Sequence, residues 1–152
     1  MPSDYFEIES FAANKFPTLF KIPKCKVHTI VAKRTFWEKA TILHHEANRP
    51  DDSPIPPRYS RHYYDLAMMA KSDVKDDALK DIKLLQNVVE FKERFYPRGW
   101  AKYEDAKIGT LKLLPPDFRL IELEKDYKAM GNMIFDKYIS FDEIIKTLEE
   151  LE

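Results

Sequence analysis

Apolar residues recur at helical spacing along most of this chain. The clearest stripe stands at i, i+4, i+7 and i+11 and consists of Phe36, Ala40, Leu43 and Ala47. This spacing predicts an amphipathic helix over about 34–48 that buries one face. Similar apolar periods, bounded by capping residues, proline and glycine, predict further helices. Their ranges are about 60–71, 75–96, 117–135 and 141–151.

One stretch, near 26–32, has the β-branched composition that is typical of a strand. A short helix is predicted near 5–15, ended by Pro17. A lone strand leaves its backbone N–H and C=O groups without partners. Either another segment pairs with it weakly, or its sheet lies in a part of the protein outside this chain. The predicted fold class is mainly α: a single helical domain over 1–152 with five or more helices and one short N-terminal β-strand.

Prolines and serines mark two boundaries in the predicted fold. Four prolines fall within residues 50–58, which predicts an exposed loop rather than a helix or a central strand. Ser60 and Ser140 each precede a predicted helix and are expected to cap it.

Composition excludes several classes of function. The 25 basic and 26 acidic residues give a net charge of −1, so no overall basic field attracts nucleic acid. Cys25 is the only cysteine, which excludes an internal disulfide and a cysteine-based metal cluster. Only three glycines occur, which removes the glycine-rich phosphate loops of Walker and Rossmann type. No apolar run is long enough to cross a membrane and no signal peptide is evident, so we expect a cytoplasmic protein.

Two sets of residues have alternative interpretations. The sequence from His44 to Glu46 resembles a metal site, but adjacent helical side chains point about 100° apart and seldom share one metal. We therefore expect a surface or interface role for these histidines and no metal site. Several large aromatic residues could stack on nucleic-acid bases. At helical spacing they belong more often to a core, which is our expectation for Tyr63, Tyr64, Tyr96, Trp100 and Tyr103.

Lys39 and Asp65 are the candidate catalytic residues. Lys39 lies at the edge of the apolar stripe, where a lysine can bury its stem and hold its ammonium group at the rim of a cleft. Asp65 has almost only apolar neighbours on its own helix, so its carboxylate needs a partner. Arg61 and His62 are the local candidates, and Lys39 is the distant one. Arg34 can pair with Glu38 at i, i+4.

These residues lie in two motifs that resemble a known family. Thr35–Ala40, followed by Ser60–Leu66, is similar to the third and fourth motifs of the AbiEii/AbiGii-type nucleotidyltransferase toxins. That family belongs to the polymerase-β-like nucleotidyltransferases and includes abortive-infection toxins of type IV toxin–antitoxin systems. Asp126–Phe135 also resembles its C-terminal helical region, so the likeness covers roughly residues 11–152.

The resemblance implies roles for single residues. Lys39 matches the lysine that contacts the nucleotide, Asp65 matches an acid of the cleft, and Arg61 matches a basic position. The expected nucleotide-binding residues are Lys39, Arg34 and Arg61. His62 stands where many members have a second aspartate, so the chain departs from the pattern there.

Two further family motifs are absent from this chain. They are a Gly-Ser pair and an Asp-x-Asp, whose aspartates hold the divalent metals. We therefore expect the C-terminal helical part of a nucleotidyltransferase, forming one wall of the nucleotide cleft and inactive alone. Its expected partners are a missing N-terminal catalytic half, a nucleoside triphosphate, RNA and an antitoxin, with Mg²⁺ needed by the intact enzyme and no cofactor in this chain. The alternative is a stand-alone helical interaction module without catalytic activity.

Overall fold

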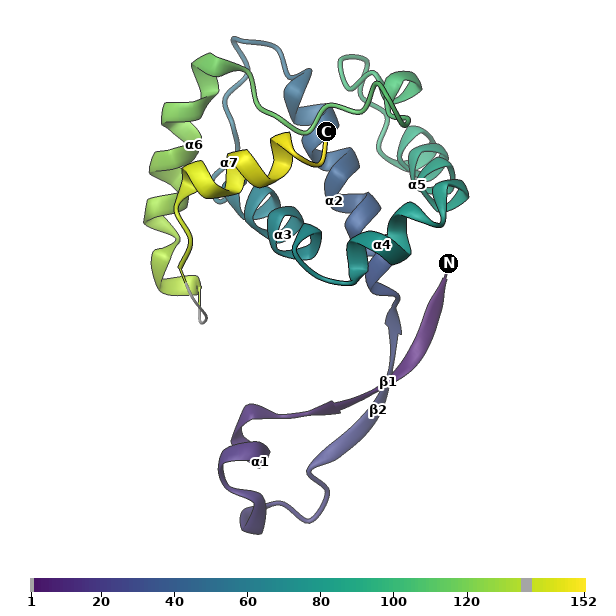
Figure 1. The fold of residues 1–152 in the computed structure, drawn as a ribbon, viewed down its shortest axis with the longest axis vertical. Coiled ribbons are helices and arrows are strands. Elements are labelled where there is room, and N and C mark those ends of the chain that lie inside the picture. Colours follow the sequence, from purple (N-terminus) through teal and green to yellow (C-terminus); the bar gives the residue numbers. More distant parts are fainter. Residues whose placement is uncertain (1, 135–137) are drawn as a thin grey trace. The chain divides into compact units, whose positions relative to one another are not determined.

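Helices dominate the structure, a computed structural model that describes residues 2–134 and 138–152 (Figure 1). Within that part, seven α-helices accompany two strands. The helices are α1 (Phe11–Lys15), α2 (Ala32–Ala47), α3 (Ser60–Ala70), α4 (Val74–Leu79), α5 (Ile82–Phe95), α6 (Asp117–Ala129) and α7 (Phe141–Glu149). The strands are β1 (Ser3–Glu9) and β2 (Lys24–Ile30). The mainly α fold class with five or more helices is thus confirmed.

The chain divides into two compact units, residues 1–32 and 33–152. The first holds β1, β2 and α1, and the second holds nearly all of α2 and every later helix. A single domain over 1–152 stays a prediction.

The N-terminal unit corrects two predictions, the single strand near 26–32 and the helix near 5–15. β1 and β2 form an antiparallel pair whose register runs from Ser3 opposite Ile30 to Glu9 opposite Lys24. The predicted strand needed a hydrogen-bonding partner, and the segment 3–9 supplies it in place of a helix. The only α-helix that lies wholly within the described residues of this unit is α1, which Ser10 caps by accepting a hydrogen bond from the Ala13 N–H.

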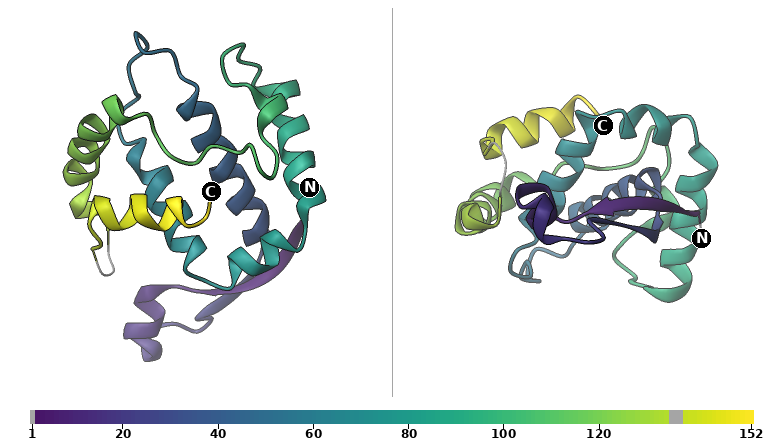
Figure 2. Two further views of the ribbon diagram at one scale, coloured as in Figure 1. Left: turned by 45° about the horizontal axis from the view of Figure 1, so that its top comes forward. Right: turned by 90° about the horizontal axis from the view of Figure 1, so that it is seen from below.

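Helix α2 is the centre of the helical unit. The views of Figures 1 and 2 agree that α3 and α5 lie on opposite sides of it. Phe36, Ala40 and Leu43 are each at most 1% exposed, which confirms these three members of the predicted apolar stripe, whereas Ala47 is only partly buried. Trp37 is buried beside them, and its indole N–H donates a 3.2 Å hydrogen bond to the Ala78 carbonyl of α4.

Two of the predicted long helices are shorter than expected. The range 75–96 is interrupted, because Asp81 leaves helical geometry at φ −122° and ψ 62° between α4 and α5. Its carboxylate pairs with Lys33 of α2 at 2.6 Å, which ties the break to the central helix. The range 117–135 ends as α6 at Ala129 and continues into a single 3₁₀ turn over 131–133. The predicted end at 135 lies outside the described residues.

Helix α3 begins differently from the prediction, because Ser60 does not cap it. Tyr59 occupies the N-cap position without a side-chain cap, and Ser60 is the first helical residue. Asp126 of α6 instead accepts hydrogen bonds from the Arg58 N–H at 2.7 Å, the Ser60 N–H at 3.0 Å and the Ser60 hydroxyl at 2.5 Å. A carboxylate from another helix thus accepts the Ser60 N–H, one of the free N–H groups at the start of α3. Ser140 caps α7 as predicted, by accepting from the Glu143 N–H.

We predict that Leu66→Ala lowers the free energy of unfolding by about 2–5 kcal/mol, because Leu66 is fully buried and truncation leaves a cavity. Met68→Ala is the matched control on the same helix, since Met68 is partly exposed. Its effect should stay within about 0.5 kcal/mol. Urea unfolding measures both, and equal losses would contradict the described core.

We also predict that Asp126→Ala destabilises the protein by about 1–2 kcal/mol, because it removes the acceptor of three hydrogen bonds at the start of α3. Glu124→Ala on the same helix is the control, since it removes only an exposed pair with Lys128. Burial favours the neutral Asp126 carboxyl, but the hydrogen bonds from Ser60 and Arg58 outweigh burial and lower the pKa. The stabilisation should therefore be complete above the ordinary aspartate pKa and disappear as the pH falls through the lowered one.

Candidate functional site

Lys39 and Asp65 meet between α2 and α3. The Lys39 Nζ lies 2.6 Å from the Asp65 Oδ2, and the two side chains are 20% and 39% exposed. The prediction that these groups come from different helices and approach each other is confirmed. A short and partly buried ion pair holds the lysine head in one place while one side stays open to solvent. The catalytic roles of the two residues stay predictions.

His62 is the third member of this cluster. Its Nδ1 lies 3.2 Å from the Lys39 Nζ, and the residue is 7% exposed. Burial, with the nearby charges of Lys39 and Arg61, lowers the pKa of His62 to about 4. The ring is therefore neutral at pH 7, and its Nδ1 accepts from the ammonium group, which carries donors only. The histidine in the place of the family's second aspartate thus binds the same lysine without adding a charge.

The lysine has one donor left for a ligand. An ammonium group carries three N–H bonds. Within the described part of the chain, Asp65 and His62 take two of them. The third is available to an anionic oxygen at the partly exposed side of the cluster.

The two predicted arginines differ in their environment. Arg34 is 4% exposed, donates to Glu38 at 2.8 Å and lies over the Phe91 ring at 5.5 Å. Arg61 is exposed and, among the described residues, has no hydrogen bond or ion pair. Asp65 therefore pairs with Lys39 and not with Arg61. Arg61 is the cation that is free to approach a ligand, whereas Arg34 is held by its own helix and by α5.

Sequence analysis missed Lys92, which lies on α5. It is 8% exposed, and its ammonium nitrogen donates a 2.9 Å hydrogen bond to the Glu38 carbonyl, next to Lys39 in sequence. A signal was present, because Leu85, Val88 and Lys92 stand at i, i+3 and i+7. That spacing puts the lysine on the buried face of the helix.

The sequence predicted a surface or interface role for the histidines of α2. They are instead buried and have structural roles. His44 accepts from the Lys112 N–H at 3.0 Å and contacts the Lys102 carbonyl at 2.9 Å, so it fastens the later loops to α2. His45 contacts Glu46 at 2.7 Å, and Arg49 binds the same carboxylate. Both histidines are buried because their ring nitrogens find partners inside the fold.

The carboxylates of this site do not suit a magnesium ion. Magnesium is held by oxygen ligands, usually from one or two carboxylates with phosphates and water. Here Asp65 is occupied by Lys39, and within residues 2–134 and 138–152 no group of three or more His, Cys, Asp or Glu side chains could hold a metal. No helix in the described part of the chain is long and apolar enough to cross a membrane.

We predict that the protein is less stable at about pH 5 than at about pH 8, and that His62→Asn reduces this difference. His62 stays neutral in the folded protein down to a pKa of about 4, whereas it takes up a proton below 6.5 in the unfolded chain. Its contribution is therefore present above 6.5 and is lost as the pH falls toward 4. Asparagine preserves an acceptor for Lys39 but cannot take up the proton.

Urea unfolding at both pH values measures this effect. His28→Asn serves as the control, because His28 lies exposed on β2. The buried His44 and His45, whose pKa values burial also lowers, should leave part of the pH dependence in His62→Asn. An unchanged difference in His62→Asn would contradict a neutral, buried His62.

Comparison with known proteins gave a single type of match. A family model described as "Nucleotidyl transferase AbiEii toxin, Type IV TA system" matches residues 3–147. No curated protein and no solved structure matches the chain. The family match does not support the narrower expectation of a likeness to the C-terminal half only. Because it covers nearly the whole chain, the chain belongs to the AbiEii nucleotidyltransferase toxin family.

Proposed function

We propose that this chain forms one wall of the nucleotide cleft of an AbiEii-type nucleotidyltransferase and that Lys39 contacts the phosphates. The observation that carries the proposal is the Lys39 ammonium group, held by Asp65 at 2.6 Å and by His62 at 3.2 Å with one N–H left. A lysine fixed in this way is preorganised to stabilise negative charge on a phosphoryl group. Arg61, exposed on α3 next to His62 in sequence, is a second cation.

Asp65 acts mainly by positioning Lys39. Its carboxylate bonds directly to the ammonium group, so it determines where that charge lies. The neutral His62 completes the arrangement without repelling a phosphate or adding a second negative charge beside it. The Lys39–Asp65 pair is neutral as a whole, so the net positive charge beside it comes from the exposed Arg61.

The metal-binding carboxylates are proposed to come from a catalytic half that is not in this chain. Support for this comes from the poor fit of Asp65 to magnesium and from the missing Asp-x-Asp motif. In nucleotidyl transfer, the metal ion binds the triphosphate and stabilises its developing charge. The present chain would contribute the positioning of the phosphates by its cations.

The family description also indicates partners. A toxin of a type IV system is expected to have an antitoxin, and a nucleotidyltransferase needs a nucleoside triphosphate and an acceptor. We propose RNA as the candidate acceptor.

A stand-alone interaction module remains the second candidate function. The observation that favours it is the N-terminal unit, which exposes large apolar side chains on and between its strands. They include Tyr5, Phe11, Leu19 and Ile22. Loss of nucleotide transfer in a Lys39 variant distinguishes the two candidate functions. An interaction module would not depend on the cluster of Lys39, Asp65 and His62.

We predict that Lys39→Ala lowers nucleotide transfer by at least about 100-fold in a protein that includes the metal-binding motifs, without unfolding it. The lysine head lies at the partly exposed rim, so its removal leaves no large cavity in the core. Transfer of labelled nucleotide to RNA and thermal melting measure the two effects. Lys33→Ala is the matched control, because Lys33 also lies on α2 and makes a 2.6 Å pair with a distant carboxylate, Asp81.

Calorimetric titration of this chain alone should show only weak binding of a nucleoside triphosphate, with or without magnesium. Residues 2–134 and 138–152 offer cations but no group of three or more carboxylates, histidines or cysteines for the metal, and lysine and arginine charges open to solvent are screened by salt. Micromolar affinity of the isolated chain, or full activity of Lys39→Ala, would contradict the proposal.

A further inference from the structure

A pocket of about 460 Å³ lies between α2, α5 and the segment 96–103. This volume falls within the range of small-molecule sites. Its polar lining includes Glu38, whose neighbour in the chain is Lys39. None of the residues predicted as site residues lines the pocket.

Aromatic side chains form much of the pocket wall. They are Tyr59, Phe91, Tyr96 and Tyr103. Tyr96 is 61% exposed, and its expected place in the core is therefore wrong. Arg98 is also exposed and lines the same pocket. The Arg98 guanidinium lies over the Trp100 ring, 5.5 Å from its centroid. An exposed tyrosine and an exposed arginine in one pocket provide flat surfaces for stacking on an aromatic ring.

Lys92 lies at the buried side of the pocket without a carboxylate partner. Among the described residues, its ammonium nitrogen has one hydrogen bond, to the Glu38 carbonyl, and no ion pair. An isolated buried charge is costly, and such lysines are often functional. Burial lowers the pKa of Lys92 to about 7, with Glu38 opposing this shift and Lys39 reinforcing it. His45 and His62 lie close enough to Lys92 for its charge to lower the pKa of each ring. Burial is the larger cause of both shifts and keeps the rings neutral.

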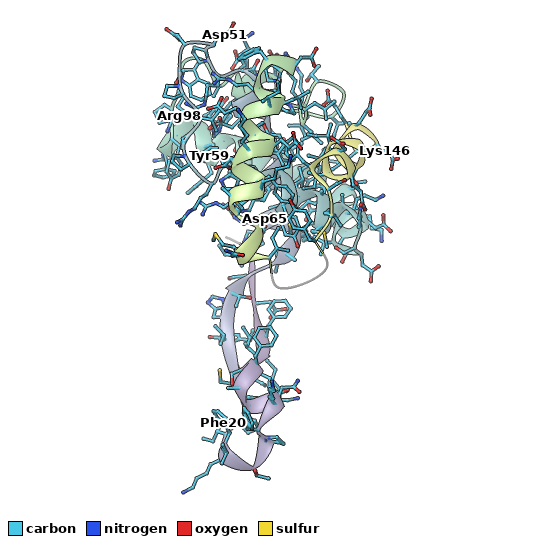
Figure 3. The ribbon with its side chains drawn as sticks, turned by 90° about the vertical axis from the view of Figure 1, so that its left-hand side faces the viewer. Phe20, Asp51, Tyr59, Asp65, Arg98 and Lys146 are labelled. Atoms are coloured by element: carbon cyan, nitrogen blue, oxygen red, sulfur yellow. The ribbon has the colours of Figure 1, made fainter. Side chains whose placement is uncertain are left out.

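Tyr59 lines the pocket and contacts the cluster of Lys39, Asp65 and His62. Its ring packs edge-on against His62 with the centroids 5.0 Å apart, and His62 contacts Lys39. Figure 3 views the helical unit from the α6 side and labels Tyr59, Arg98 and Asp65. Tyr59 thus lines the pocket and also packs on a residue that contacts Lys39.

We propose that this pocket receives the base of a nucleoside phosphate, which stacks against Tyr96 and Arg98 and contacts Lys92. The proposal rests on the proposed nucleotide-binding function and adds the part of the ligand that Lys39 does not contact. Lys92 has donors left for the oxygen or nitrogen acceptors of a base. The aromatic and cationic lining suits a flat ring that carries negative charge.

Pyridoxal 5′-phosphate tests the proposal, because it combines an aromatic ring, a phosphate and an aldehyde. The neutral Lys92 amine adds to the aldehyde carbon and water leaves, which gives an imine. Borohydride then delivers hydride to the imine carbon, and the nitrogen takes a proton from water. Mass spectrometry of peptides from the full chain locates the resulting secondary amine.

At neutral pH, Lys92 should be labelled before Lys83, which lies exposed on the same helix. A nucleoside triphosphate at millimolar concentration should protect Lys92 several-fold, and a nucleoside should protect it more than inorganic triphosphate does. Neither should protect Lys83. Weak binding suffices for this result, because the trapped adduct accumulates. Unreactive Lys92, or labelling that nucleosides leave unchanged, would overturn the proposal.

Tyr96→Ala and Arg98→Ala should each reduce the protection of Lys92 several-fold. Phe95→Ala and Arg94→Ala are the matched controls, because they remove exposed neighbours that do not line the pocket. Thermal melting verifies that each variant is folded. If Lys39→Ala keeps full transfer while nucleosides still protect Lys92, only the proposed function fails. If transfer depends on Lys39 but nucleosides do not protect Lys92, only the pocket proposal fails.

Discussion

The central helix α2 must satisfy polar groups that it carries into the interior, and the helical unit is arranged around this constraint. Three of these groups are met by three different elements. The Trp37 indole bonds to α4, Lys39 bonds to α3, and the Glu38 carbonyl accepts from Lys92 of α5. Since a buried polar group without a partner is costly, these bonds fix how the neighbouring helices are placed. Hydrophobic burial supplies the driving force, and the polar bonds select one arrangement of the helices.

The same arrangement creates the charge distribution of the site. Lys39, Lys92 and Arg61 approach from three helices, and Asp65 is the only carboxylate bonded to them in the described residues. A positive excess of this kind favours an anionic ligand, although the chain as a whole has a net charge of −1. Burial keeps the nearby histidine neutral and holds Lys92 close to the point where it gives up its proton.

Much of the fold could be predicted from the sequence because apolar periodicity is a local signal. The stripe on α2 and the Ser140 cap follow directly from spacing and residue type. The pairing of β1 with β2 could not be predicted in the same way, since the partner of a strand is set by tertiary contacts and not by local propensity. The Lys39–Asp65 contact was within reach of sequence reasoning, because a carboxylate among apolar neighbours needs a distant cation. The pocket beside it was not, because its wall comes from three separate segments.

The start of helix α3 has a consequence for the order of folding. Its capping carboxylate, Asp126, is 66 residues later in the chain than Ser60. Closing so long a loop has an entropic cost that must be met before the hydrogen bonds form. The first turn of α3 is therefore completed only when α6 has docked, and contacts of such high sequence separation slow folding. Ribosomal synthesis would release α3 well before α6, so His62 and Asp65 would reach their final geometry at a late stage of folding.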